Sequence, residues 1–101
     1  MSEHYILEGH KAVEADLMTW ARWFETSSRA DRIVARTELA ECTVSTVFIG
    51  LDHNLGDGPP HIFETLVLGG KLADEMERYS TWEQAEAGHE VMVGRVRETL
   101  S

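Results

Sequence analysis

Two apolar runs separated by a long polar segment constrain the fold of this chain more than any other feature. The runs cover residues 42–49 and 62–68, and their β-branched and aromatic residues are typical of half-buried strands. The segment 50–61 between them is rich in Gly, Pro, Asp and Asn, and it is too long for a tight hairpin turn. We therefore expect two strands joined by a long polar loop.

Further strands are predicted on the N-terminal side of these runs. Residues 33–39 alternate imperfectly between apolar and polar side chains, which indicates a strand with one solvated face that leads directly into the 42–49 run. Residues 4–15 predict a short strand, a turn near Gly9 and His10, and a second short extended piece. An edge strand from this region would give an antiparallel sheet of four strands instead of three.

Two amphipathic helices are predicted. Asp16 is a suitable N-cap for the first, because Leu17, Trp20 and Phe24 then follow helical spacing, and this helix should end near residues 26–28. The second helix begins at residues 80–83, where Ser-Thr-Trp-Glu matches a capping box. Its apolar stripe consists of Ala85, His89, Met92, Val93, Val96 and Leu100. The stretch 71–79 between sheet and helix has the character of a charged linker.

These elements predict a single α+β domain over residues 1–101. The order β-α-β-β-β-α favours a two-layer sandwich, in which both helices pack on one face of a three- or four-stranded antiparallel sheet. The other sheet face and the bulky side chains of the first helix leave apolar area uncovered, so we expect a homo-oligomer. Trp20 and Trp23 are the predicted interface residues.

Composition narrows the class of partner. Eighteen acidic residues against nine basic ones give a net charge of −9, which disfavours direct binding to nucleic acid. The acidic residues are scattered, which favours a role in solubility over an acidic docking face. No apolar run approaches the length of a membrane span, and the N-terminus does not have the pattern of a secretory signal. We expect a cytoplasmic protein whose single Cys42 is a buried apolar residue.

The polar loop carries the first group of candidate ligand-binding residues: Asp52, His53, Asp57 and His61. Loops between rigid strands often bind ligands. Carboxylates and imidazoles also suit a divalent metal, but their spacing matches no established metal motif, and turn formation by the Asp side chains is the competing explanation. We assign no metal and no cofactor to this loop.

A second group of candidates lies around the start of the last helix: Arg78, Tyr79, Trp82 and His89. Aromatic rings stack on planar ligands and arginine pairs with phosphate, so this group favours a nucleotide-like molecule. Core packing is the alternative for the aromatic residues and for His89. No Ser-His-Asp or Cys-His pattern is present in the spacing, and the sequence therefore favours a non-catalytic protein.

Short motifs spread over nearly the whole chain occur at residues 16–25, 44–53, 58–60, 63–65, 69–70, 78–83 and 87–89. Together they resemble a family of small, uncharacterised proteins of bacteriophage and prophage genomes. The resemblance implies a phage origin but does not imply any particular activity. By analogy, phage accessory proteins of this size often block a host defence complex or sequester a nucleotide immune signal.

The sequence thus predicts a non-catalytic binding protein of phage type, a host-defence inhibitor that captures a host protein or a nucleotide-derived immune signal. A metal-dependent hydrolase of small phosphorylated compounds, centred on Asp52, His53, Asp57 and His61, is the main alternative. A minor structural or assembly protein of the virion is a further one.

Overall fold

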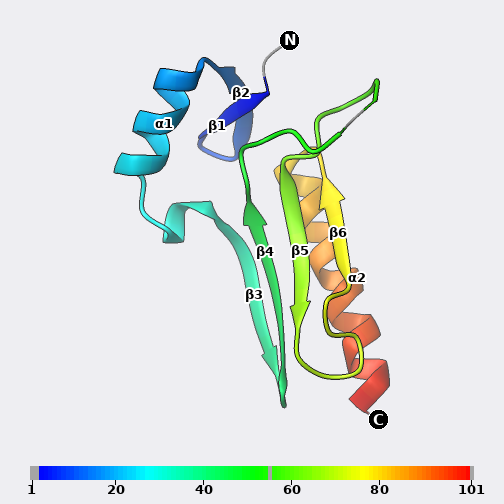
Figure 1. Cartoon of the computed structure of the whole chain (residues 1–101). Helices are drawn as coiled ribbons and strands as arrows, with labels where there is room; N and C mark the ends of the chain where they lie inside the picture. The colour runs from blue at the N-terminus through cyan, green and yellow to red at the C-terminus, as the bar shows by residue number, and fades with distance from the viewer. Residues whose placement is uncertain (1–2, 55, 101) are drawn as a thin grey trace.

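The computed structural model describes residues 3–54 and 56–100. The elements are, in chain order, β1 (His4–Glu8), β2 (Lys11–Ala15), α1 (Leu17–Thr26), the 3₁₀-helix η1 (Ala30–Arg32), β3 (Ile33–Leu39), β4 (Cys42–Phe48), β5 (Phe63–Leu68), β6 (Met76–Tyr79) and α2 (Trp82–Leu100). β1 and β2 form an antiparallel hairpin, and β3-β4-β5-β6 form an antiparallel sheet in that order (Figure 1). The predicted α+β class is confirmed.

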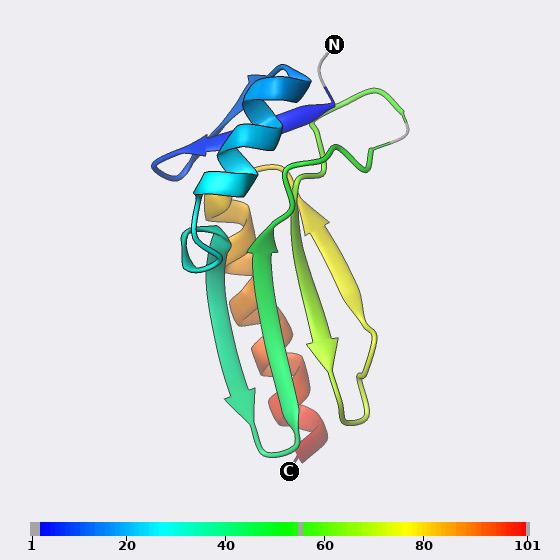
Figure 2. The same ribbon diagram turned by 60° about the vertical axis from the view of Figure 1, so that its left-hand side comes forward.

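Helix α2 alone covers one face of the four-stranded sheet (Figures 1 and 2). The buried residues of β4 alternate with partly exposed ones, and those facing α2 are Cys42, Val44, Thr46 and Phe48. At 1.5 Å per residue, a 19-residue helix spans about 28 Å, whereas a seven-residue strand spans about 23 Å. A single helix of this length is therefore sufficient to cover the sheet from end to end.

Helix α1 does not lie beside α2, which corrects the expectation that both helices pack on one sheet face. It packs against β1 and the end of β4, and its Trp23 and Phe24 rings lie 5.7 and 6.2 Å from the Phe48 ring. The physical reason is that α2 already covers the sheet, while the β1–β2 hairpin offers a separate apolar surface. Figure 2 shows α1 and the hairpin above the end of the sheet.

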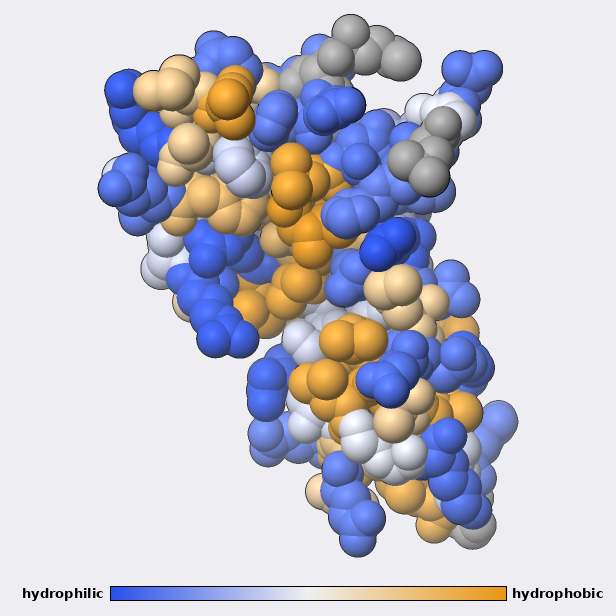
Figure 3. All heavy atoms as spheres, viewed as in Figure 1, coloured by the Kyte–Doolittle hydropathy of each residue, from blue (hydrophilic) through white to orange (hydrophobic). Residues whose placement is uncertain are grey.

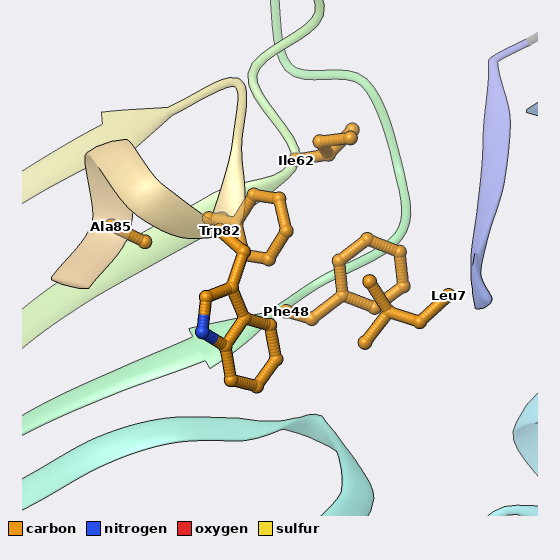
Figure 4. Close-up of a cluster of buried hydrophobic side chains, with 6 residues drawn as sticks. Leu7, Phe48, Ile62, Trp82 and Ala85 are labelled. Carbon is orange, nitrogen blue, oxygen red and sulfur yellow. The ribbon is translucent and has the colours of Figure 1, made fainter. Parts of the chain in front are cut away.

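The core consists of two apolar clusters. The first joins the sheet to the N-terminal hairpin and contains Leu7, Phe48, Ile62, Phe63, Trp82 and Ala85 (Figure 4). The second lies between the other half of the sheet and α2 and contains Cys42, Val44, Val67, Met92, Val93 and Val96. Cys42 is buried and free, as expected. Three buried polar residues, Thr46, Thr65 and His89, complete the interior.

Both helix starts are capped by side chains. At α1, Oδ1 of Asp16 accepts a hydrogen bond from the Thr19 amide at 2.8 Å, which confirms the predicted cap. At α2, the cap is Thr81 and not Ser80, because Oγ1 of Thr81 accepts from the Gln84 amide at 3.0 Å. The Gln84 side chain accepts in turn from the Ser80 amide. The capping pattern therefore starts one residue later than the sequence motif indicates.

The other face of the four-stranded sheet is not covered by a helix in the described part of the chain. Leu68 and Met76 on this face are 44% and 43% exposed. Two ion pairs lie on the same face, Arg36 with Glu38 and Arg78 with Glu64. Figure 3 shows this face, with an apolar band between α1 and the sheet and hydrophilic side chains around it. The sheet thus presents a mixed apolar and charged surface.

The strand β6 occupies part of the stretch that the sequence indicated as a charged linker. Its residues pair with β5 in the register Phe63 to Tyr79 and Glu64 to Arg78. β6 is an edge strand, so it lacks the continuous apolar pattern of β4. Its Arg78 forms an ion pair with Glu64 of β5. Among the described helices, none is long and apolar enough to cross a membrane.

Candidate functional site

The polar loop after β4 is folded by its own side chains. Oδ1 of Asp52 accepts hydrogen bonds from the backbone amides of Asn54 and His61, at 2.8 and 3.0 Å. The Asn54 side chain donates to the carbonyl of Pro59 at 2.9 Å and accepts from the Gly56 amide at 3.0 Å. Asp52 and Asn54 therefore act as turn-forming residues that hold the two ends of the loop together.

The charge of Asp52 is stabilised by this arrangement. Burial acts to raise the pKa of its carboxyl, but the amide hydrogen bonds from Asn54 and His61, with the charges of His61 and His53, outweigh burial and lower the pKa. Oδ1 of Asp52 accepts both of these hydrogen bonds and so holds the loop together. Asp52 is thus a structural carboxylate, and this outcome matches the turn explanation that the sequence left open.

The loop residues do not gather into a metal-binding group. In residues 3–54 and 56–100, no three His, Cys, Asp or Glu side chains are placed to hold one ion. His53 and Asp57 are exposed, whereas Asp52 and His61 are half-buried. The hydrolase alternative therefore gains no support from the geometry of Asp52, His53, Asp57 and His61.

Arg78 and Tyr79 are neighbours in sequence but lie on opposite faces of the sheet. Arg78 is on the uncovered face, where its Nε lies 3.1 Å from Oε2 of Glu64. The Tyr79 ring lies on the α2 side, directly against Gly88. Burial raises the pKa of Tyr79, and the hydrogen bond between its hydroxyl and Thr65 opposes this rise. Because adjacent residues of a strand point to opposite faces, these two candidates do not form one site.

His89 lies in the interior and makes a polar layer between the two apolar clusters. Its side chain is fully buried. Nδ1 is 2.7 Å from Oγ1 of Thr46, and Nε2 is 2.8 Å from Oγ1 of Thr37. Thr46 and Thr65 are also joined, with their Oγ1 atoms 2.5 Å apart. A ligand cannot reach His89 without separating α2 from the sheet, so His89 is removed from the candidate site as a core residue.

Trp82 borders a cavity that we call the aromatic pocket. It has a volume of about 520 Å³ and lies between the β1–β2 turn, the segment from α1 to β3, and the start of α2. Its lining residues are Leu7, Gly9, His10, Trp23, Ser27, Ala30, Asp31, Ile33 and Trp82. A second cavity of about 470 Å³ also borders His10 and Trp82. Small-molecule sites have volumes of about 300–1,000 Å³, so either cavity has a suitable size.

His10 and Trp82 form a parallel stack at the wall shared by these two cavities. Their ring centroids are 3.8 Å apart and their planes differ by 5°. His10 is exposed in the turn of the hairpin, whereas Trp82 is 7% exposed. Nε1 of Trp82 is buried and has no hydrogen-bond partner within residues 3–54 and 56–100. Figure 4 shows this nitrogen on the side of the indole that faces away from Leu7.

The predicted interface residues pack partly within the molecule. Nε1 of Trp20 donates to the carbonyl of Gly50 at 3.1 Å, and Trp23 packs edge-on against Phe48. The apolar residues that α1 leaves outward are Leu17 and Met18, which are 58% and 68% exposed. The spare apolar area of α1 therefore lies in its first turn.

Sequence reasoning missed His10 and Asp31 as members of a site. The sequence indicates a turn at His10, and its partner Trp82 is distant in sequence, so no local spacing connects the two residues. Asp31 lies in η1, where no local sequence pattern indicates a site. The one available signal was the number of aromatic residues, which exceeded what the two predicted helix stripes needed.

Comparison with known proteins gives no relative from which to transfer a function. No protein-family model matches the chain, and no curated protein and no solved structure matches it. Fold and site alone describe this chain as an α+β protein with an aromatic pocket.

Proposed function

We propose that this protein is a non-catalytic binding protein of phage type, which captures a small planar ligand such as a nucleotide-derived immune signal of the host. The binding site is the aromatic pocket, and the place of action is the host cytoplasm. The observation that carries the proposal is the parallel stack of His10 on Trp82. It is supported by the pocket volume and by the second indole, Trp23, in the same lining.

The chemistry of the pocket suits a ring more than a charged group. Stacking of one nucleic-acid base on an aromatic side chain contributes about 1–3 kcal/mol, and it tolerates different bases because each has a π face. Trp23 and His10 line the pocket and supply such rings, whereas one face of Trp82 is already covered by His10. The carboxylate of Asp31 can accept hydrogen bonds from a base.

The first test is a thermal-shift screen with cyclic nucleotides and ADP-ribose-type nucleotides. A ligand present at 100 times its Kd stabilises the folded protein by about 2.7 kcal/mol, which raises the Tm of a chain of this size by roughly 10 °C or more. A screen without any stabilisation would contradict nucleotide capture and would favour a host protein as the partner.

The second test is the affinity of Trp23→Leu for a ligand found in the screen, measured by calorimetry. Leucine retains apolar volume but removes the ring, so we expect a loss of about 1–3 kcal/mol of binding free energy. Trp20→Leu is the matched control, because Trp20 belongs to the same helix but does not line the pocket. Equal weakening by both variants would show that helix packing, and not the pocket, governs binding.

A further inference from the structure

A third cavity, which we call the arginine pocket, lies on the uncovered face of the four-stranded sheet. It has a volume of about 410 Å³ and is lined by Arg29, Arg32, Ile33, Arg36, Ser45, Val47 and Phe48. Three of the nine basic residues of an acidic chain thus border one small cavity. From this concentration of guanidinium groups, we infer that the arginine pocket binds the phosphate group of a small molecule.

The backbone places these arginines on one side. Residues three apart eclipse each other in a 3₁₀-helix, so Arg29, the residue preceding η1, and Arg32, its last residue, project in the same direction. Arg36 lies further along β3, directly opposite Ser45 of β4 in the strand register. Ser45 and Arg36 share the uncovered face, because the neighbouring Thr46 points to α2 and bonds His89.

The arginines differ in how firmly they are held. Arg32 is fixed, since its Nη1 donates to Oγ of Ser27 at 2.8 Å and its guanidinium lies 5.0 Å from the Phe24 ring centre. The Arg29 guanidinium has no ion pair or hydrogen bond to any residue in the described part of the chain. Among the described residues, Arg36 pairs only with Glu38, at 3.6 Å, and both side chains are exposed. Such a surface pair is weak, so Arg36 is free to bind a stronger anion.

This combination fits a phosphate better than a single carboxylate. A guanidinium presents its N–H donors in a planar fork that matches phosphate oxygens, and several forks around one cavity suit a multivalent anion. The hydroxyl of Ser45 is a further donor. Ile33 and Val47 provide an apolar wall for the rest of a small ligand, and a volume of about 410 Å³ is too small for a folded protein segment. The inference does not depend on the aromatic pocket, which shares only Ile33 with this cavity.

The inference is tested by calorimetric titration of the full chain with inorganic pyrophosphate, and with acetate as a monovalent comparison, at one fixed ionic strength. We expect saturable binding of pyrophosphate and much weaker binding of acetate. Arg29→Ala and Arg36→Ala should each weaken pyrophosphate binding about tenfold, because each removes charge-assisted hydrogen bonds. Arg97→Ala, near the end of α2, is the matched control and should leave the affinity unchanged.

A variant that should strengthen binding tests whether Arg36 contacts the phosphate directly or only supports the local structure. Glu38→Gln removes the carboxylate that competes for Arg36, so pyrophosphate affinity should rise by about two- to fivefold. Absence of saturable pyrophosphate binding by the unmodified protein would overturn the inference. Equal weakening by Arg97→Ala would also overturn it, because the effect would then reflect overall charge. Unfolding midpoints of the unliganded variants confirm that each protein is folded.

Discussion

At the scale of single residues, His89 has the most unusual environment, because an ionisable ring is enclosed between threonine hydroxyls. Both ring nitrogens are hydrogen-bonded, to Thr46 and Thr37, and the side chain has no solvent contact. Burial lowers the pKa of His89 from its ordinary value of 6.5, and the charge of Glu90 opposes this only in part. The neutral imidazole donates from one nitrogen and accepts at the other, which suits two hydroxyl partners.

This environment predicts a pH dependence of stability. The unfolded chain takes up the His89 proton near pH 6.5, whereas the folded chain takes it up only at lower pH. The stabilisation is therefore fully present above about pH 6.5 and is lost as the pH falls from there to the folded-state pKa. The slope from one proton is at most about 1.4 kcal/mol per pH unit. Urea unfolding at a series of pH values measures it.

The control for this prediction is His89→Gln. Glutamine retains a donor and an acceptor for the threonine hydroxyls but does not titrate, so the part of the slope that belongs to His89 should disappear. His53→Gln, a change of the same kind at an exposed loop residue, should retain the slope. An unchanged slope in His89→Gln would mean that other groups cause the acid sensitivity.

At the scale of elements, α2 contains two glycines in different surroundings. A Cβ at Gly88 would meet the Tyr79 ring, whereas a Cβ at Gly94 would have no neighbour within 4 Å. The side chain that approaches Gly88 is Tyr79 of β6. Gly88 therefore permits the contact between α2 and β6, while Gly94 serves no such purpose.

The two glycine-to-alanine variants should change stability in opposite directions. Gly94→Ala should raise the free energy of unfolding by about 0.5–1 kcal/mol, because alanine is the better helix former. Gly88→Ala should lower it by about 1–3 kcal/mol, because the added methyl group displaces the half-buried Tyr79 ring. Urea unfolding compares both with the unmodified chain. A stabilised Gly88→Ala would show that the ring moves without cost.

Elements with strong local patterns were predictable from sequence, and those that depend on distant partners were not. The β4 and β5 runs and the stripe of α2 carry their periodicity in adjacent residues, and Asp16 marks the start of α1 locally. β6 is different, because its strand character comes from pairing with β5. The same limit applies to the site: only the fold brings His10 to Trp82, and it separates Arg78 from Tyr79.

At the scale of the whole molecule, the exposed apolar side chains include Leu17 and Met18 of α1 and Leu68 and Met76 of the sheet. The chain measures 46 × 31 × 19 Å, and such a thin body has limited interior for its apolar residues. The sequence-based expectation of a homo-oligomer formed partly through the sheet stays a prediction.

Size-exclusion chromatography with light scattering tests the oligomer. We expect a mass of at least twice the 11.4 kDa of one chain. Leu68→Lys should lower the mass by placing a charge on the uncovered sheet face, whereas Val91→Lys, at a 66% exposed position of α2, should not. A monomeric unmodified protein at working concentrations would contradict this prediction.

The polar layer between the two apolar clusters determines how α2 is aligned along the four-stranded sheet. A purely aliphatic interface would let α2 slide by one turn, about 5.4 Å, with little loss of burial. If His89 moved by that distance, the hydroxyls of Thr37, Thr46 and Thr65 would be buried against methyl groups. Those of Thr37 and Thr46 would then lack the hydrogen bonds that His89 makes. An imidazole matched to these hydroxyls thus selects one alignment of helix and sheet, and that alignment also determines where Trp82 meets the hairpin.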